Sequence, residues 1–160
     1  MNRAGAVDPS DYFAIQNLLN GYPYALDSGD FDGVGLLLGD AVVYSGGELM
    51  ADRDAAAVAR AFSGWVITYP DGTPRTRHYL ANLIIEANGP AGAVARSYVV
   101  VLQQAPDQAL QPVICGDYRD TLRKLDGRWR IVERRMGNDL IGNLAHHGRD
   151  PGVVRPSRAN

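Results

Sequence analysis

A histidine beside a carboxylate can act as a base, and the sequence offers one candidate pair. His78 lies in residues 75–82, where the alternation expected of a strand puts His78, Leu80 and Asn82 on one face. If that face is buried, both polar side chains need partners, because an unpaired buried polar group costs about 1–3 kcal/mol. Asp27, near the end of the first predicted helix, is a suitable partner for His78.

The chemistry of such a pair is that of a general base. A carboxylate that accepts a hydrogen bond from one imidazole nitrogen fixes the tautomer and leaves the other nitrogen free to take a proton. The unperturbed pKa of histidine, about 6.5, is close to the ideal for this role at neutral pH. Spacing alone does not bring the two residues together, so the alternative that Asp27 is a solvated helix-end residue stays open.

Tyrosine and arginine side chains could complete a site around this pair. Tyr22 and Tyr44 could each direct a hydroxyl at a substrate oxygen or a water, although aromatic residues at such spacings are more often part of a core. Arg134 and Arg135 face opposite ways on the last predicted strand, and alternation does not say which of them is solvated.

The other histidines and the single cysteine do not indicate a metal site. His146 and His147 lie in the predicted C-terminal tail, where we expect them to be solvated, and no further ligand has a suitable spacing. Cys115 is the only cysteine, so neither an internal disulfide nor a cysteine-based zinc site is available. We expect no metal and no cofactor.

Composition narrows the class of protein. The chain has 160 residues and a net charge of −2 with no basic block, which argues against nucleic-acid binding. It has no run of 18 apolar residues that would indicate a membrane span. The N-terminus lacks the apolar region of a signal peptide, so we expect a cytoplasmic protein.

The order of the predicted elements is helices first and strands afterwards. Apolar residues at three- and four-residue steps predict a helix over residues 9–28, in which Pro23 should cause a kink or cost a hydrogen bond. Asp52 can cap a later helix. The other predicted helices are 31–38 and 53–66, and the predicted strands are 41–45, 76–86, 93–104, 112–124 and 128–138.

This order predicts an α+β fold with the helices packed on one face of a curved, mostly antiparallel sheet. We expect one domain over residues 1–145 and an irregular tail over residues 146–160, which contains Pro151 and Pro156.

Three motifs in this order resemble the SnoaL-like branch of the NTF2-like superfamily, whose fold is a cystatin-like cone. They are Leu26-Asp27-Ser28-Gly29-Asp30-Phe31-Asp32, Thr76-Arg77-His78-Tyr79, and Gly116-Asp117-Tyr118 followed by Asp126-Gly127-Arg128-Trp129-Arg130-Ile131. The resemblance covers residues 15–137. It implies that Asp27 and His78 match the Asp–His dyad of two cofactor-free lyases, scytalone dehydratase and hexachlorocyclohexane dehydrochlorinase.

The resemblance also assigns roles to other residues. Arg134 matches an arginine of the dehydrochlorinase pocket, Tyr44 a water-holding tyrosine of scytalone dehydratase, and Tyr22 a tyrosine of the related bile-acid dehydratase. The match is incomplete, because Leu26 replaces a tyrosine of scytalone dehydratase and residues 97–102 lack its second histidine.

Together these observations favour a dehydratase-type lyase. His78 would remove a proton from carbon, Asp27 would orient His78, and Tyr22, Tyr44, Arg134, Asn82 and Trp65 would contact a small ring-containing substrate. The alternatives are an isomerase or polyketide cyclase using the same pocket, and a non-catalytic assembly subunit like the β-subunit of a ring-hydroxylating dioxygenase. We expect a homodimer or homotrimer. The expected apolar lining is Leu18, Leu26, Phe62, Trp65, Leu80 and Val99.

Overall fold

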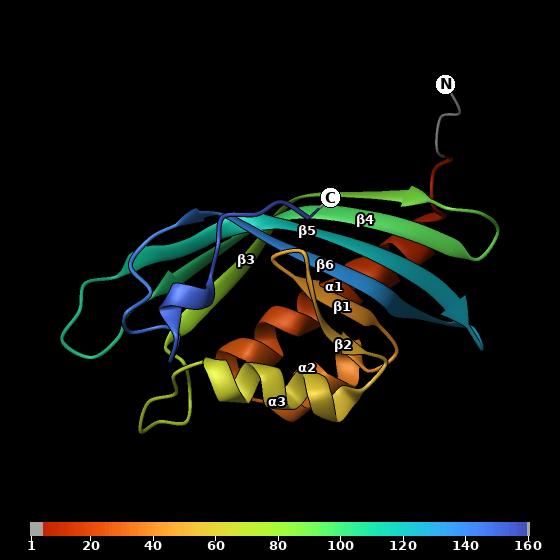
Figure 1. The fold of residues 1–160 in the computed structure, drawn as a ribbon. Coiled ribbons are helices and arrows are strands. Elements are labelled where there is room, and N and C mark those ends of the chain that lie inside the picture. The colour runs from red at the N-terminus through yellow and green to blue at the C-terminus, as the bar shows by residue number, and fades with distance from the viewer. Residues whose placement is uncertain (1–4, 160) are drawn as a thin grey trace.

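The computed structural model describes residues 5–159 and has two layers, helices on a sheet. Figure 1 shows the helices lying against the concave face of a curved sheet. The helices are α1 (Pro9–Ser28), α2 (Phe31–Leu38) and α3 (Ala55–Trp65). The strands are β1 (Val42–Ser45), β2 (Glu48–Asp52), β3 (Thr76–Ala87), β4 (Gly92–Gln103), β5 (Gln111–Leu125) and β6 (Arg128–Ile141).

The sheet is mostly antiparallel, and this confirms the predicted fold class. Its order is β2-β1-β6-β5-β4-β3, and β1 pairs with β6 in parallel while every other neighbouring pair is antiparallel. Long hairpins join β3 through β6, as the turn signals predicted. The core lies between the sheet and the helices, where Ile15, Leu19 and Val34 are almost inaccessible to solvent. Burial of such side chains, each worth about 1.5–3 kcal/mol, holds the helices on the sheet.

Two local predictions were wrong near β1. The strand β2 was not predicted; Gly46 and Gly47, both at positive φ, turn the chain back so that β2 pairs with β1. Helix α3 is capped by Asp54, which accepts a hydrogen bond from the Ala57 backbone amide, and not by Asp52. Asp52 instead ends β2.

Strand β3 contains an irregularity that overturns one prediction about its faces. The pairing of β3 with β4 shifts between Ala81 and Ile84, and Asn82 has a φ of 54°. This bulge breaks the alternation, because an extra residue turns the following side chains. Asn82 is therefore exposed and does not share the buried face of His78.

The C-terminal segment contacts the end of α3 and then β6, where the Arg149 amide donates to the Trp65 carbonyl and the Ser157 amide to the Asn138 carbonyl. A short 3-10 helix, η1 (Pro151–Val153), follows a bridge between Val66 and Gly148. Within residues 5–159 no helix is long and apolar enough to cross a membrane.

Candidate active site

Asp27 and His78 are in direct contact at the wall of a cavity. The Nδ1 atom of His78 lies 2.6 Å from Oδ1 of Asp27, and the side chains are only 6% and 11% exposed. Asp27 accepts two more hydrogen bonds, from the Thr76 hydroxyl at 2.7 Å and from the backbone amide of His78 at 2.8 Å. With three donors on it, the carboxylate has one defined orientation.

The end of α1 places Asp27 against β3. Gly29 ends the helix in the left-handed conformation, with a φ of 79°, and its amide donates to the carbonyls of Ala25 and Leu26. A side chain at Gly29 would collide with the carbonyl oxygen of Gly72, because a Cβ would lie 2.2 Å from it. A glycine is therefore required where α1 meets the loop before β3.

The charge on Asp27 is stabilised despite its burial. Burial by itself would raise the pKa of this carboxyl, but the hydrogen bonds and positive charge of His78, with the Thr76 hydrogen bond, outweigh it and lower the pKa. Asp27 is therefore ionised at neutral pH and accepts a hydrogen bond from the Nδ1–H group of His78. No described residue bonds to Nε2, which is the nitrogen left to accept a proton.

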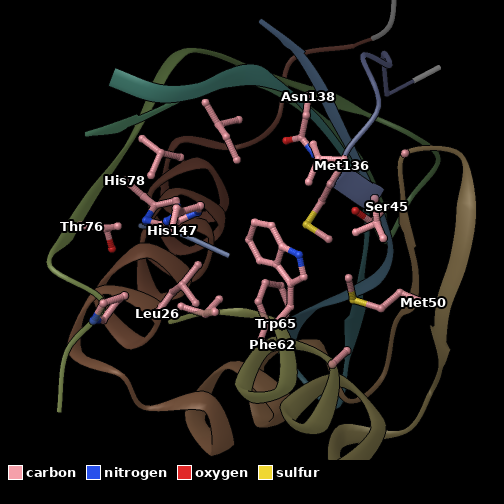
Figure 2. Close-up of a pocket in the computed structure, with 18 of the residues that line it drawn as sticks. Leu26, Ser45, Met50, Phe62, Trp65, Thr76, His78, Met136, Asn138 and His147 are labelled. Carbon is pink, nitrogen blue, oxygen red and sulfur yellow. The ribbon is translucent and has the colours of Figure 1, made fainter. Parts of the chain in front are cut away.

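The cavity beside this pair has a volume of about 380 Å³, within the range of small-molecule sites. Figure 2 shows His78, Thr76 and His147 on one side of it, with Ser45, Met50 and Met136 on the other. Its lining is mainly apolar. The apolar lining residues include Leu26, Met50, Phe62, Trp65, Val101, Ile114 and Met136. Leu26, Phe62 and Trp65 were predicted, whereas Leu18, Leu80 and Val99 do not line the cavity.

Tyr22 and Tyr118 also line the cavity. Tyr22 is 1% exposed, its ring packs edge-on against His78 and Tyr118, and its hydroxyl donates to the sulfur of Met136 at 3.9 Å. Burial raises the pKa of Tyr22 well above its ordinary value and also raises that of Tyr118. Both phenols therefore stay protonated and can donate hydrogen bonds.

Arg134 lies behind these tyrosines and outside the cavity lining. Its guanidinium is fully buried and forms two hydrogen bonds with Asp120, at 2.7 and 3.0 Å. It lies 4.5 Å from the ring centre of Tyr22 and 5.1 Å from that of Tyr118. Desolvation works against the charged form, but the Asp120 carboxylate outweighs it and raises the pKa of Arg134. Arg134 is thus a permanent charge held by Asp120.

Comparison with known proteins agrees with this architecture. The model of the SnoaL-like domain matches residues 9–135. The chain belongs to this family. No curated protein sequence matches it significantly.

Solved structures of similar fold cover most of the chain. A Mycobacterium tuberculosis protein of unknown function is 27% identical over 94% of this chain and 83% of its own, with a TM-score of 0.67. A candidate scytalone dehydratase from Novosphingobium aromaticivorans is 21% identical over 93% and 92%, with a TM-score of 0.68. An NTF2-like protein with a cystatin-like fold from the same species is 23% identical over 86% of both chains, with a TM-score of 0.65. The cystatin-like, NTF2-like cone is thereby confirmed.

Tyr44 and Asn82 were also predicted to contact substrate, but in this SnoaL-like domain neither lines the cavity. Tyr44 packs against Arg135, whose guanidinium lies 4.3 Å from its ring centre. Arg135 is the partly exposed member of the arginine pair and bonds to Glu133. Asn82 is turned away by the bulge in β3. Trp65, by contrast, lines the cavity as predicted.

His147 is a site residue that the sequence prediction placed wrongly in solvent. It is 4% exposed, lines the cavity, and packs edge-on against Trp65 with ring centres 5.3 Å apart. The tail composition hid it, because proline and glycine suggested an irregular, solvated segment. Among the described residues, no group of three or more His, Cys, Asp or Glu side chains is placed to hold a metal ion.

Proposed function

We propose that this SnoaL-like domain is a cofactor-free lyase, a dehydratase, in which His78 is the general base. The observation that carries the proposal is the 2.6 Å contact between Nδ1 of His78 and Asp27 at the wall of a mainly apolar cavity. The substrate is a small ring compound with a hydroxyl group on the carbon β to a carbonyl group, because an apolar lining with few polar groups favours such a molecule.

The reaction begins with proton removal from the carbon next to the carbonyl. Nε2 of His78 takes this proton, the carbon–hydrogen electron pair forms the enolate, and Asp27 stabilises the resulting imidazolium. The enolate then expels the β-hydroxyl group, which receives the proton from His78 and leaves as water. The net change is loss of one water and formation of one carbon–carbon double bond.

The residues around the dyad support the two charged species of the reaction, the imidazolium and the enolate. Positioned base catalysis contributes roughly 10²–10⁴-fold, and placed dipoles in a dry cavity contribute more. The protonated phenols of Tyr22 and Tyr118 can donate to substrate oxygens. Arg134 acts from behind their rings, where its positive charge favours negative charge in the cavity.

The test is turnover of a panel of ring hydroxyketones by the wild type, His78→Ala and the matched control His146→Ala. His146 is a neighbouring histidine outside the cavity lining, and its backbone carbonyl accepts hydrogen bonds from Tyr69 and Gln103. We expect the wild type and His146→Ala to release water from at least one compound, and His78→Ala to lose activity at least about 100-fold.

Other outcomes separate the rival functions. Return of the proton to a different carbon without water loss would indicate an isomerase, and ring closure would indicate a cyclase. Equal turnover by the wild type and His78→Ala would remove His78 from the chemistry. Binding without turnover by either would favour a ligand-binding or assembly subunit. A homodimer or homotrimer remains our expectation, to be measured by the molar mass in solution.

A further inference from the structure

His147 is a strongly buried polar side chain of the cavity that the proposed mechanism does not use. Its imidazole lines the cavity, and no residue that the structure describes bonds to either ring nitrogen. Nδ1 is enclosed without a partner, and Nε2 is the nitrogen left to a ligand. Buried polar groups in proteins are nearly always paired, because an unpaired one costs about 1–3 kcal/mol. An imidazole left unpaired in a cavity wall is therefore a candidate for completing its hydrogen bonds with a ligand.

Several backbone hydrogen bonds fix the segment that carries His147. Its backbone carbonyl accepts from Ile67, and the next residue, Gly148, pairs with Val66. Arg149 donates to three carbonyls at the end of α3, those of Ser63, Gly64 and Val66, at 2.7, 3.2 and 2.6 Å. These contacts fix the segment to the end of α3 and so position the His147 ring before any ligand binds.

Gly148 shows how closely this segment packs. A Cβ at this position would lie 2.2 Å from the indole of Trp65, so only glycine lets the chain pass. Trp65 in turn donates its indole N–H to the backbone carbonyl of Asp150 at 3.1 Å. The Trp65 ring, the chain and the His147 ring therefore form one packed unit at the cavity wall.

The charge state of His147 defines what it can do. Burial, helped by the nearby charge of His78, lowers the pKa of His147 to about 4, so the ring is neutral at neutral pH. A neutral imidazole is a poor proton donor in catalysis, but its N–H is a good hydrogen-bond donor to an oxygen that becomes negative. His147 and His78 lie on the same side of the cavity (Figure 2), and both rings line it.

We propose that His147 binds the carbonyl oxygen of the substrate and stabilises the enolate that forms when His78 removes the neighbouring proton. This inference rests on the proposed function and assigns the residue that holds the carbonyl oxygen of its ring substrate. The electron pair of the broken carbon–hydrogen bond moves onto the oxygen that the His147 N–H holds, and the proton moves to Nε2 of His78. The His147 ring stays neutral throughout.

The experiment compares two probes of similar shape, 2-naphthol and naphthalene. The oxygen of 2-naphthol imitates that of a planar enol, and naphthalene lacks it. We measure the dissociation constants of both for the wild type, His147→Phe, His147→Gln and the control His146→Ala. Phenylalanine keeps a ring against Trp65 without a nitrogen, and glutamine keeps a donor, so a change in folding is distinguished from loss of the hydrogen bond.

We expect His147→Phe to weaken 2-naphthol binding about 5- to 10-fold, the usual effect of one hydrogen bond, while naphthalene binding changes less than about 2-fold. His147→Gln should recover part of the preference for 2-naphthol, and His146→Ala should keep all of it. Equal effects of His147→Phe on both probes, or a wild type that binds 2-naphthol no better than naphthalene, would overturn the proposal.

Solvent exchange separates this proposal from the proposed function. In D₂O the wild type should exchange the α-hydrogens of 2-tetralone, His78→Ala should not, and His147→Phe should do so more slowly. If the wild type shows no exchange but His147 still selects 2-naphthol, the base mechanism fails and the oxygen site survives. If exchange needs His78 but is unaffected by His147→Phe, the base stands and the role of His147 falls.

Discussion

Tyr22 contacts two buried pairs of an aspartate and a basic residue, and they differ in what they can do. On its cavity side, Asp27 holds His78 through one ring nitrogen. On the other side, Asp120 holds Arg134 through two hydrogen bonds, and both side chains are at most 2% exposed. Of these four residues only His78 lines the cavity.

The difference lies in the partner of the carboxylate. A guanidinium is charged at all accessible pH values, so the Asp120–Arg134 pair has no proton to exchange and serves packing and a fixed field. An imidazole gains and loses a proton near neutral pH, so the Asp27–His78 pair can do chemistry. We therefore expect changes in the first pair to affect the rate, and changes in the second to affect stability.

The largest expected effect on stability comes from Asp120→Ala. It leaves Arg134 buried without its partner, and such a change costs about 3–5 kcal/mol. The free energy of unfolding from urea denaturation measures this cost, with His146→Ala as the control. A loss below about 1 kcal/mol would show that the pair is not a buried structural unit.

Asp27→Asn should lower the rate more than the stability. The amide cannot stabilise the imidazolium, so we expect kcat/KM for the substrate found in the panel to fall about 100-fold. The free energy of unfolding of Asp27→Asn should fall by less than that of Asp120→Ala. A variant that is unstable but fully active when folded would reverse the assignment of the two pairs.

A fall in pH should lower the stability of the folded protein through His147. The folded state lowers the pKa of His147 from 6.5 to about 4, so below pH 6.5 the unfolded chain binds a proton that the folded chain does not. Stability is therefore lost as the pH falls from 6.5 towards 4. The contribution of Asp27, whose pKa is also lowered, is lost only below about pH 4.

We expect the wild type to lose about 2 kcal/mol more than His147→Phe between pH 7 and pH 5. Urea denaturation at the two pH values measures this difference. Parallel losses in the two proteins would mean that His147 is not buried as a neutral ring.

Thr76→Val should have the smallest effect. It removes one of the three hydrogen bonds to Asp27 and keeps the shape of the side chain, so the cost is about 1 kcal/mol. We expect a fall in kcat/KM of about 5-fold together with a small loss of stability. No change in the rate would show that His78 alone orients Asp27.

The sequence predicted the helices and hairpins well because their signals are local. Asp30 and Gly29 mark the boundary between α1 and α2, and Asp126-Gly127 marks the last hairpin. The dyad needed the family resemblance, because nothing local connects Asp27 with His78. The prediction of which β3 side chains share a face was wrong beyond Ala81, because a bulge cannot be recognised from the alternation of side chains along a strand.

The positions of the His147 and Arg134 side chains depend on tertiary contacts, and for this reason they were not predicted. His147 is buried because Arg149 ties its segment to the end of α3, a contact between residues 83 to 86 positions apart that composition does not reveal. Arg134 was predicted to contact substrate, but Asp120 opposite it on β5 binds the guanidinium behind the cavity wall. Strand register across a hairpin could have suggested this pair.

The most direct measurement is the ¹⁵N NMR spectrum of the His78 ring at neutral pH in the wild type and in Asp27→Asn. We predict that in the neutral ring of the wild type the proton is on Nδ1, held by Asp27, and that Nε2 carries the lone pair that faces substrate. Asp27→Asn should disturb this preference. A neutral ring with its proton on Nε2 in the wild type, or a spectrum unchanged by Asp27→Asn, would contradict the assignment of His78 as the base.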